Sequence, residues 1–475
     1  MRAAKIFQSL DSDSLGSKQP GELTAYLGHI VSPTGPESYS DFRCGAMLVD
    51  AAGTIAGIGP WSQLRQKYRS VRRIVDFGKR LLIPGLVDMH LHLPQITQIG
   101  RSGQSLLGWL EEYIFPAEAR FLDSAHALRV ATWFFDELVR NGTTTACVFT
   151  TIHAEASEIA FRVAASRGNR VIMGKVMMDA NAPESLSEDS SLALHQSEEL
   201  CRRWHGHDGG RLLYAFTPRF ALTSSSNLLS GTGSLWSKFP GTYLHTHLAE
   251  NQEEVLLVKR QFPGSRSYTD VYQSHGLLAR NSIFAHSIHL DQHDLTCLAE
   301  TKSALAHCPS SNFFLKSGAF PYEQVKQVGV SCGLGSDVAA GPGLCLFGVM
   351  KDAAYMQADL WISPAELLYL GTLAGARALN LDQKVGSLLP GKEADFLVIN
   401  PGRKSCIQAD ILDRTTDEIL SSLVYLGDDR LVEATYVRGR AVYQVDEGHV
   451  ESQRQRKAGA ADMPPAVYPT AAGLK

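Results

Sequence analysis

The sequence lacks the cysteine spacing of a zinc finger or a disulfide-rich domain. Its eight cysteines are scattered over 475 residues with no C-x-x-C, so neither a cysteine zinc site nor a disulfide framework is indicated. We expect reduced thiols, as in most intracellular proteins. No apolar run has the length of a membrane span, and residues 1–20 lack the sustained apolar segment of a secretion signal. These absences predict a cytoplasmic protein with no membrane partner.

The chain also lacks the excess of positive charge that nucleic-acid-binding proteins carry. It has 45 Lys and Arg residues against 49 Asp and Glu residues, a formal net charge of -4, and no Lys/Arg-rich run. We therefore expect no nucleic-acid partner. Apolar residues make up 44% of the chain and charged residues 20%, which is typical of a soluble globular protein with an ample core. This length allows about three average domains, or one large barrel with a smaller domain.

Residues 84–384 alternate short apolar strands with amphipathic stretches. The stretches 125–142 and 154–168 have helical periodicity, and each ends in a Gly that commonly terminates a helix. Eight such strand–helix units in about 300 residues predict an α/β fold of the TIM (β/α)8 type. A doubly wound sheet would alternate in the same way, but no glycine-rich fingerprint opens any of these helices. The expected strands are 85–92, 143–149, 170–178, 211–220, 242–250, 282–290, 303–312 and 330–338.

Short β segments separated by Gly and Pro lie on both sides of the expected barrel. They occupy residues 1–83 and 385–450, and we expect these two parts to build one small composite β domain together. Residues 451–475 are polar, rich in Ala, Gly and Pro, and aperiodic. They predict a disordered tail.

Two histidines, His90 and His92, stand one residue apart where the first barrel strand should end. On an extended backbone, residues two apart point to the same face. Two neutral imidazoles that share one space suit a metal ion. An isolated H-x-H is also compatible with partly exposed loop histidines, because the motif is short.

Other residues of the types that bind metals lie at the ends of further strands of the expected barrel. Active sites of this fold lie at the C-terminal ends of the strands. Histidines at three strand ends and an Asp at a fourth predict a site with nitrogen and oxygen ligands. Besides His90 and His92, the strand-end residues are His245, His247, Glu250, His286, His289, His307 and Asp337.

The motifs PGLVDMHLH, THLAEN, AHSIHL, HCPSSN and GLGSDV resemble the amidohydrolase superfamily, in its metal-dependent deaminase branch. Two further segments, LLGWLEEYIFPAEARF at 106–121 and TPRF at 217–220, are similar to the guanine deaminase family within that branch. The H-x-H and GSD motifs are shared across the superfamily, whereas these two segments are more specific. The resemblance covers roughly residues 20–445.

The resemblance implies a TIM barrel beside a composite β domain and a homodimer. It also implies one zinc ion per chain and hydrolysis of guanine to xanthine and ammonia. By position, the zinc ligands would be His90, His92, His247 and Asp337. Glu250 would carry protons, with His286 and Asp337 beside the attacking water. The substrate would contact His92, Gln95, Arg219, Phe220, His247, Glu250 and Asp337.

Each of these roles has a simpler alternative. Glu250 could be a carboxylate stabilised at a helix N-terminus, Arg219 could form a salt bridge at the rim, and Gln95 could be ordinary loop polarity. The 106–121 segment could be a packing helix interrupted by Pro116, or part of a lid. Another heterocycle could be the substrate: cytosine, 8-oxoguanine, a triazine or an adenosine derivative. A barrel that has become a catalytically inactive scaffold would be expected to have lost metal ligands.

Overall fold

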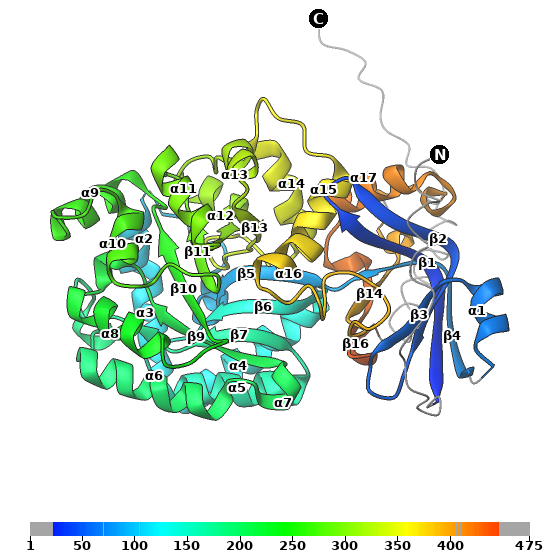
Figure 1. The fold of residues 1–475 in the computed structure, drawn as a ribbon, viewed down its shortest axis with the longest axis horizontal. Coiled ribbons are helices and arrows are strands. Elements are labelled where there is room, and N and C mark those ends of the chain that lie inside the picture. The colour runs from blue at the N-terminus through cyan, green and yellow to red at the C-terminus, as the bar shows by residue number, and fades with distance from the viewer. Residues whose placement is uncertain (1–21, 70, 104, 405, 409, 446–475) are drawn as a thin grey trace, which may run out of the picture.

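The structure, a computed structural model, describes residues 22–69, 71–103, 105–404, 406–408 and 410–445. The predicted tail at 451–475 lies outside the described residues. The chain forms a large strand–helix barrel with a smaller β sheet beside it (Figure 1). No helix within the described ranges is long and apolar enough to cross a membrane. All eight cysteines fall within these ranges and are free.

Eight parallel strands form a nearly closed barrel, which confirms the predicted fold. In sheet order they run β13-β12-β11-β10-β9-β7-β6-β5, and the short β8 pairs with β9. Backbone bonds complete the ring between the first and last strands: Asp337 N–H donates to the His90 carbonyl at 2.9 Å, and His92 N–H donates to the Val338 carbonyl at 3.3 Å. The strands are β5 (Leu86–His92), β6 (Thr143–Phe149), β7 (Arg170–Gly174), β8 (Val176–Met177), β9 (Leu212–Pro218), β10 (Tyr243–Leu248), β11 (Ser282–His286), β12 (Ala304–His307) and β13 (Ser331–Leu334).

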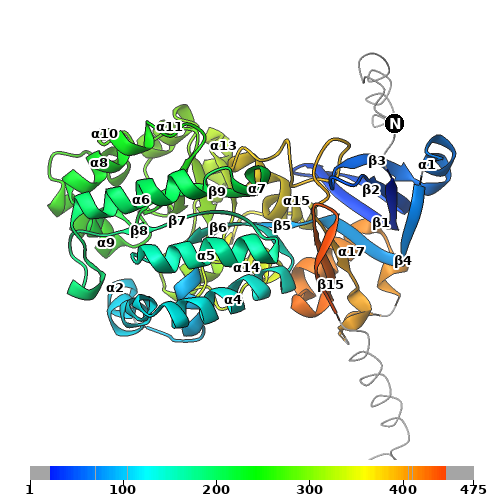
Figure 2. The same cartoon turned by 90° about the horizontal axis from the view of Figure 1, so that it is seen from below.

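Helices follow the barrel strands along the chain, and Figure 2 shows α4, α5 and α6 packed along the outside of the barrel. The two helices expected from periodicity are α4 and α5, and α5 ends at Gly168, whose φ is 86°. The principal helices of the barrel part are α4 (Ser124–Arg140), α5 (Ala154–Arg167), α6 (Ser190–Trp204), α8 (Ser226–Trp236), α9 (Gln252–Gln261), α10 (Tyr268–Ser274), α11 (Gln292–Glu300), α12 (Pro309–Phe314), α13 (Tyr322–Val328), α14 (Leu346–Met356), α15 (Pro364–Tyr369) and α16 (Gly375–Ala378).

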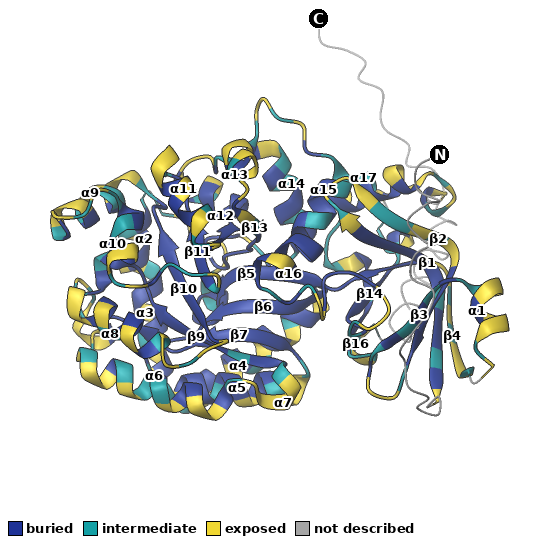
Figure 3. Cartoon of the chain, in the orientation of Figure 1, coloured by how far each residue is buried: buried dark blue, intermediate teal, exposed yellow. Residues whose placement is uncertain are grey.

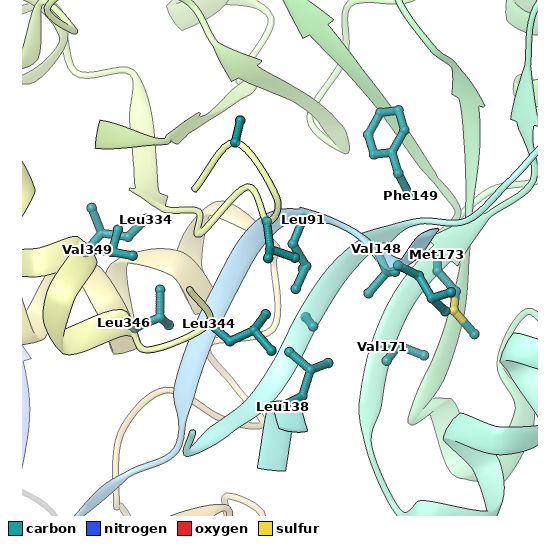
Figure 4. Packing of buried hydrophobic residues seen from close by; sticks show 14 of the residues in the cluster. Leu91, Leu138, Val148, Phe149, Val171, Met173, Leu334, Leu344, Leu346 and Val349 are labelled. Carbon is teal, nitrogen blue, oxygen red and sulfur yellow. The ribbon is translucent and has the colours of Figure 1, made fainter. Parts of the chain in front are cut away.

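The barrel strands are buried on both faces, as Figure 3 shows by their dark blue colour. Side chains such as Val148 and Leu91 point outward and pack with Leu138 of α4 (Figure 4). Each apolar side chain of this size contributes about 1.5–3 kcal/mol when fully buried. The opposite, inward-facing cluster contains Met89 and Cys147. This two-sided burial explains why the strands read as apolar runs rather than as alternating patterns.

The smaller sheet combines the two ends of the described chain, as predicted. Its order is β16-β15-β14-β4-β1-β2-β3. Strand β4 pairs in parallel with β1 on one side and antiparallel with β14 on the other, which joins the N-terminal and C-terminal segments. The strands are β1 (Leu23–Gly35), β2 (Ser38–Val49), β3 (Ile55–Pro60), β4 (Val71–Pro84), β14 (Phe396–Ile399), β15 (Val432–Val437) and β16 (Arg440–Gln444), with helices α1 (Trp61–Lys67) and α17 (Thr416–Leu426) beside them.

A buried charge cluster connects the base of the barrel to the smaller sheet. Arg170, at the start of β7, is fully buried and pairs with Glu393 and Asp395. Arg438, which follows β15, donates to the same Glu393 at 2.7 Å. These contacts hold the start of β7 against the loop that precedes β14.

We expect Arg170→Met to lower the free energy of unfolding by about 3 kcal/mol, because it leaves the buried Asp395 carboxylate without its cation. Urea denaturation measures this loss. Arg167→Met is the matched control, because Arg167 pairs with Asp136 on the surface and both side chains are about half exposed; it should cost less than about 1 kcal/mol. Equal losses in the two variants would contradict the connecting role.

Several strands end earlier than the sequence predicts. Strand β10 stops at Leu248, β11 at His286 and β13 at Leu334, so Glu250 and Asp337 lie on loops just beyond their strands. His286 and Asp337 have positive φ angles of 66° and 47°. This left-handed backbone is unfavourable for residues other than Gly, and it persists only where the surroundings enforce it. The strands therefore turn at the residues that the sequence assigns to the site.

Candidate active site

The barrel brings the predicted metal ligands together at the C-terminal ends of β5, β10 and β13 (Figure 1). The Nε2 atoms of His92 and His247 are 3.1 Å apart. Asp337 Oδ1 lies 3.3 Å from His90 Nε2 and 3.4 Å from His92 Nε2. All four side chains are buried. The site is thus a compact set of three imidazoles and one carboxylate.

Hydrogen bonds behind the imidazoles fix which nitrogen faces the centre. His247 Nδ1 lies 2.7 Å from the Arg219 carbonyl, and because a carbonyl only accepts, Nδ1 carries the proton and Nε2 keeps its lone pair. His90 Nδ1 contacts His245 Nε2 at 2.9 Å. His245 therefore lies behind His90 and can support it as a ligand.

The protonation states favour binding of a cation. Burial is the main cause that lowers the pKa of His90, His92 and His247, so these rings are neutral and can act as ligands. Burial alone would raise the pKa of Asp337, but the adjacent rings of His90 and His286 outweigh it and hold that pKa below the usual range. Asp337 is therefore a carboxylate.

These residues fit a divalent metal ion. His90 Nε2 is buried and has no hydrogen-bond partner among the residues that the structure describes, an arrangement that costs free energy unless something else binds there. Two groups of side chains have ligand atoms that all lie within 4.8 Å of one another: His90 with His92 and Asp337, and His90 with His247 and His286. Three neutral imidazoles and a carboxylate are a donor set that zinc prefers.

Glu250 and His286 lie beside the proposed metal ligands. His286 Nε2 is 3.5 Å from Glu250 Oε2 and 3.6 Å from Asp337 Oδ2, while its Nδ1 donates to Asn312 Oδ1 at 2.9 Å. Burial raises the pKa of Glu250 to about 7, although the neighbouring His286 acts in the opposite direction. A carboxyl group with this pKa can both accept and donate a proton at neutral pH.

A cavity opens onto these groups. Gln95, Arg219 and Phe220 line it together with Glu250, as the resemblance implies. Its other lining residues are His92, Leu106, Trp109, Leu110, His247, His286, Leu315, Asp337 and Ala340. The mixture of apolar walls and a few directed polar groups suits a flat heterocycle.

The 106–121 segment forms part of the cavity wall. It folds as α2 (Leu106–Trp109), a π-helical turn η3 (Leu110–Ile114) and α3 (Phe115–Ala119). Leu106, Trp109 and Leu110 line the cavity from this segment. A π turn accommodates one additional residue and rotates the side chains that follow, and such turns are common at functional sites.

Glu118 of α3 is a site residue that the sequence patterns did not identify. Its carboxylate is 1% exposed and accepts hydrogen bonds from Arg219 Nη1, at 2.9 and 2.8 Å to its two oxygens. Arg219 therefore forms a buried ion pair and not a salt bridge at the rim. The one sequence signal for Glu118 was an acidic residue at helical spacing from the apolar Ile114 and Phe121, a pattern that implies burial.

Two further strand-end histidines lie around the site. His289 Nε2 donates to the Ser317 carbonyl at 2.9 Å, and the Ser317 hydroxyl reaches Glu250 Oε1 at 3.4 Å. His307 is buried and stacks on Phe320 with ring centroids 4.3 Å apart. Neither belongs to the two groups of possible metal ligands.

Comparison with known proteins agrees with this architecture. The sequence profile described as "Amidohydrolase family" matches residues 81–442. The chain belongs to the amidohydrolase family. The guanine deaminase of Escherichia coli is 40% identical over 403 residues, which cover 84% of this chain and 91% of that protein. A solved structure of E. coli guanine deaminase matches with a TM-score of 0.84 and 37% identity, and covers 89% of this chain and 99% of its own.

Two other solved structures are similar to this one. A guanine deaminase from C. acetobutylicum with bound guanine is 30% identical and has a TM-score of 0.83, with 89% of this chain and 100% of that one covered. An adenosine deaminase from Xanthomonas campestris with bound zinc is 23% identical and has a TM-score of 0.76, with 94% and 99% covered. The adenosine deaminase shares the fold of this chain.

Proposed function

We propose that this protein is a zinc-dependent guanine deaminase, which hydrolyses guanine to xanthine and ammonia. The observation that carries the proposal is one cavity lined by Glu250, by Arg219 and by three of the candidate metal ligands, with the fourth ligand, His90, close to them. Family membership and the guanine deaminases among its relatives support the same activity.

We assign the metal to His90, His92, His247 and Asp337, with one zinc ion per chain. The ion would supply Lewis acidity that activates water for attack at neutral pH. The neutral states of the three histidines and the ionised state of Asp337 support this ligand set. We place His286 outside it, because the Glu250 and Asp337 carboxylates raise its pKa above the usual value despite its burial, which disfavours the neutral ring that a ligand needs.

Glu250 carries protons in the proposed reaction. Attack at C2 of guanine disrupts the ring conjugation unless the neighbouring ring nitrogen gains a proton. Glu250 lines the same cavity as the metal-binding residues and can deliver that proton, and then another to the departing ammonia. Asp337 accepts a hydrogen bond from the attacking water, and His286 orients or deprotonates it.

Arg219, Gln95 and Phe220 recognise the purine in this proposal. An arginine donates to the C6 oxo group of guanine but has no acceptor for the C6 amino group of adenine. The Gln95 amide has both a donor and an acceptor, which suits the imidazole edge, and the Phe220 ring can pack on the purine face. Cytosine is too small to fill such a pocket.

We further infer that the protein acts in the cytoplasm as a homodimer, with no nucleic-acid or membrane partner. The net charge of -4 and the absence of a basic run support the first exclusion. The homodimer rests on the family resemblance. Large apolar side chains that are exposed in the single chain, among them Leu122, Trp133 and Trp361, provide surface for a second copy to cover.

Arg219→Ala tests the substrate assignment. We expect it to lower kcat/KM for guanine by about 10² or more while metal content stays unchanged, because it removes a charged hydrogen-bond donor and no ligand. Initial rates with guanine, adenine and cytosine measure this, and the wild type should act strongly on guanine alone. Arg211→Ala is the matched control: Arg211 is a buried arginine at the opposite end of β9, where it donates to the Asn169 carbonyl.

Three results would contradict the assignment. Adenine or cytosine turnover equal to guanine turnover would favour a deaminase or chlorohydrolase of another heterocycle. Unchanged guanine turnover in Arg219→Ala would show that other groups in the pocket recognise the base. A wild-type protein that is loaded with metal but inactive on every substrate would favour the alternative of a catalytically inactive scaffold.

A further inference from the structure

Glu118 connects two polar side chains that line the cavity, Arg219 and Gln95. It accepts from Arg219 Nη1 with both carboxylate oxygens, and Gln95 Nε2 donates to its Oε1 at 3.2 Å. All three side chains are at most 3% exposed. Glu118 itself does not line the cavity, whereas Arg219 and Gln95 do. It therefore lies behind the groups proposed to contact substrate.

Glu118 balances the charge of the Arg219 guanidinium and also restricts its orientation. Nη1 is occupied by the carboxylate, and the Phe115 ring, three residues before Glu118, lies 5.6 Å from the guanidinium carbon. An arginine fork is rigid and planar, so fixing one nitrogen and one face orients the remaining N–H groups. Those remaining donors are available to a ligand in the cavity.

The same carboxylate determines how the Gln95 amide is turned. Gln95 Nε2 donates to Glu118, and Gln95 Oε1 accepts from Ala339 N–H at 3.4 Å. A carboxylate cannot donate and a backbone N–H cannot accept, so the two ends of the amide are not interchangeable. Without Glu118, only the long 3.4 Å bond from Ala339 N–H would hold the amide against a rotation that exchanges its donor and its acceptor.

We propose that Glu118 is a positioning residue that determines substrate specificity, because it sets the order of donors and acceptors that Arg219 and Gln95 present to the purine. The inference rests on the proposed function and deepens it. Glu118 acts through its two partners and touches neither the substrate nor the reacting atoms. Its loss should therefore weaken the discrimination between bases more than it affects metal binding.

The sharpest probe of this role is 2,6-diaminopurine. It keeps the reacting C2 amino group of guanine, replaces the C6 oxo group by an amino group, and has an unprotonated N1 where guanine has N1–H. A site that donates to a C6 carbonyl should prefer guanine over this analogue by about 10⁴ in kcat/KM, because the amino group leaves buried donors unpaired. The ratio of the two kcat/KM values thus reports how firmly the donors are held.

The test compares the wild type with Glu118→Asp and Glu118→Gln. Glu118→Asp keeps the charge beside Arg219, so the fold and the metal should be retained. Its side chain is one methylene shorter and cannot reach both partners. We expect it to lower kcat/KM for guanine by about 10-fold to 100-fold and to reduce the guanine preference by at least about 10-fold. Glu118→Gln keeps the length, but both carboxylate oxygens accept from Arg219 Nη1, so its N–H₂ must face that donor and should reduce the preference further.

Glu366→Asp is the matched control. Glu366 is a buried acid that accepts from Tyr322 and Lys326, at 2.8 and 2.6 Å, and it does not line the cavity. Shortening it should leave the guanine preference unchanged.

The outcomes separate the inference from the proposed function. A metal-loaded wild type with no guanine deaminase activity would refute the function, whatever Glu118 does. A wild type that prefers guanine, together with a folded, metal-loaded Glu118 variant of unchanged preference, would overturn only the inference. If both Glu118 variants fail to fold while Glu366→Asp folds, Glu118 is a structural residue and the inference is also overturned.

Discussion

His247→Ala should yield a folded protein that has lost most of its metal and its activity. The Nε2 lone pair of His247 faces the centre because Nδ1–H donates to the Arg219 carbonyl, and it lies 3.1 Å from the corresponding nitrogen of His92. Changing a residue that only supports a ligand typically costs about 10-fold to 100-fold in metal affinity or activity. Removing a ligand itself should cost more. Elemental analysis of the purified variant, alongside initial rates, measures both losses.

His29→Ala provides the matched control for this experiment. His29 is a buried histidine that pairs with Asp41 in the smaller sheet, remote from the barrel strand ends. It should retain full metal occupancy. Full occupancy in His247→Ala as well would show that His247 is not a ligand and would refute the proposed centre.

Glu250→Gln should keep the fold and the metal but lose most turnover. The amide has nearly the same shape, yet it cannot carry a proton, and general acid–base steps typically contribute about 10² to 10⁴ in rate. Burial raises the pKa of Glu250 to about 7, which places its protonation change where the reaction needs it. The loss should appear in kcat, because Glu250 acts in the transition state and holds no metal.

Glu253→Gln is the control for the same chemical change on an exposed carboxylate in the first turn of α9. It should leave kcat unaltered. Near-normal turnover in Glu250→Gln would mean that the proton travels by another route, and His286, 3.5 Å from Glu250, would be the first candidate.

The clustering of the candidate metal ligands could be predicted from the sequence, because their positions follow from local geometry and fold topology. His90 and His92 share a face because the strand period is two, and the parallel barrel brings β5 next to the segment after β13. A histidine or an acid at a strand end therefore meets the others at one edge. The composite sheet was also predictable, because similar β patterns occur on both sides of the barrel.

The features that the sequence did not reveal depend on tertiary contacts. Glu118 meets Arg219 across 101 residues of chain, and no local pattern specifies that pairing. The strand ends were misplaced because Ala249 and Asp337 adopt positive φ, which their residue types do not suggest. The predicted strand 170–178 is divided into β7 and β8 at Lys175, a buried lysine paired with Glu188.

The most direct test of the whole account is to incubate the purified, zinc-loaded protein with guanine and to follow xanthine and ammonia together. The account predicts that both products form in equal amounts, and that Glu250→Gln with the same zinc content forms them far more slowly. A zinc-loaded wild type that releases neither product, or that does so no faster than Glu250→Gln, would contradict it.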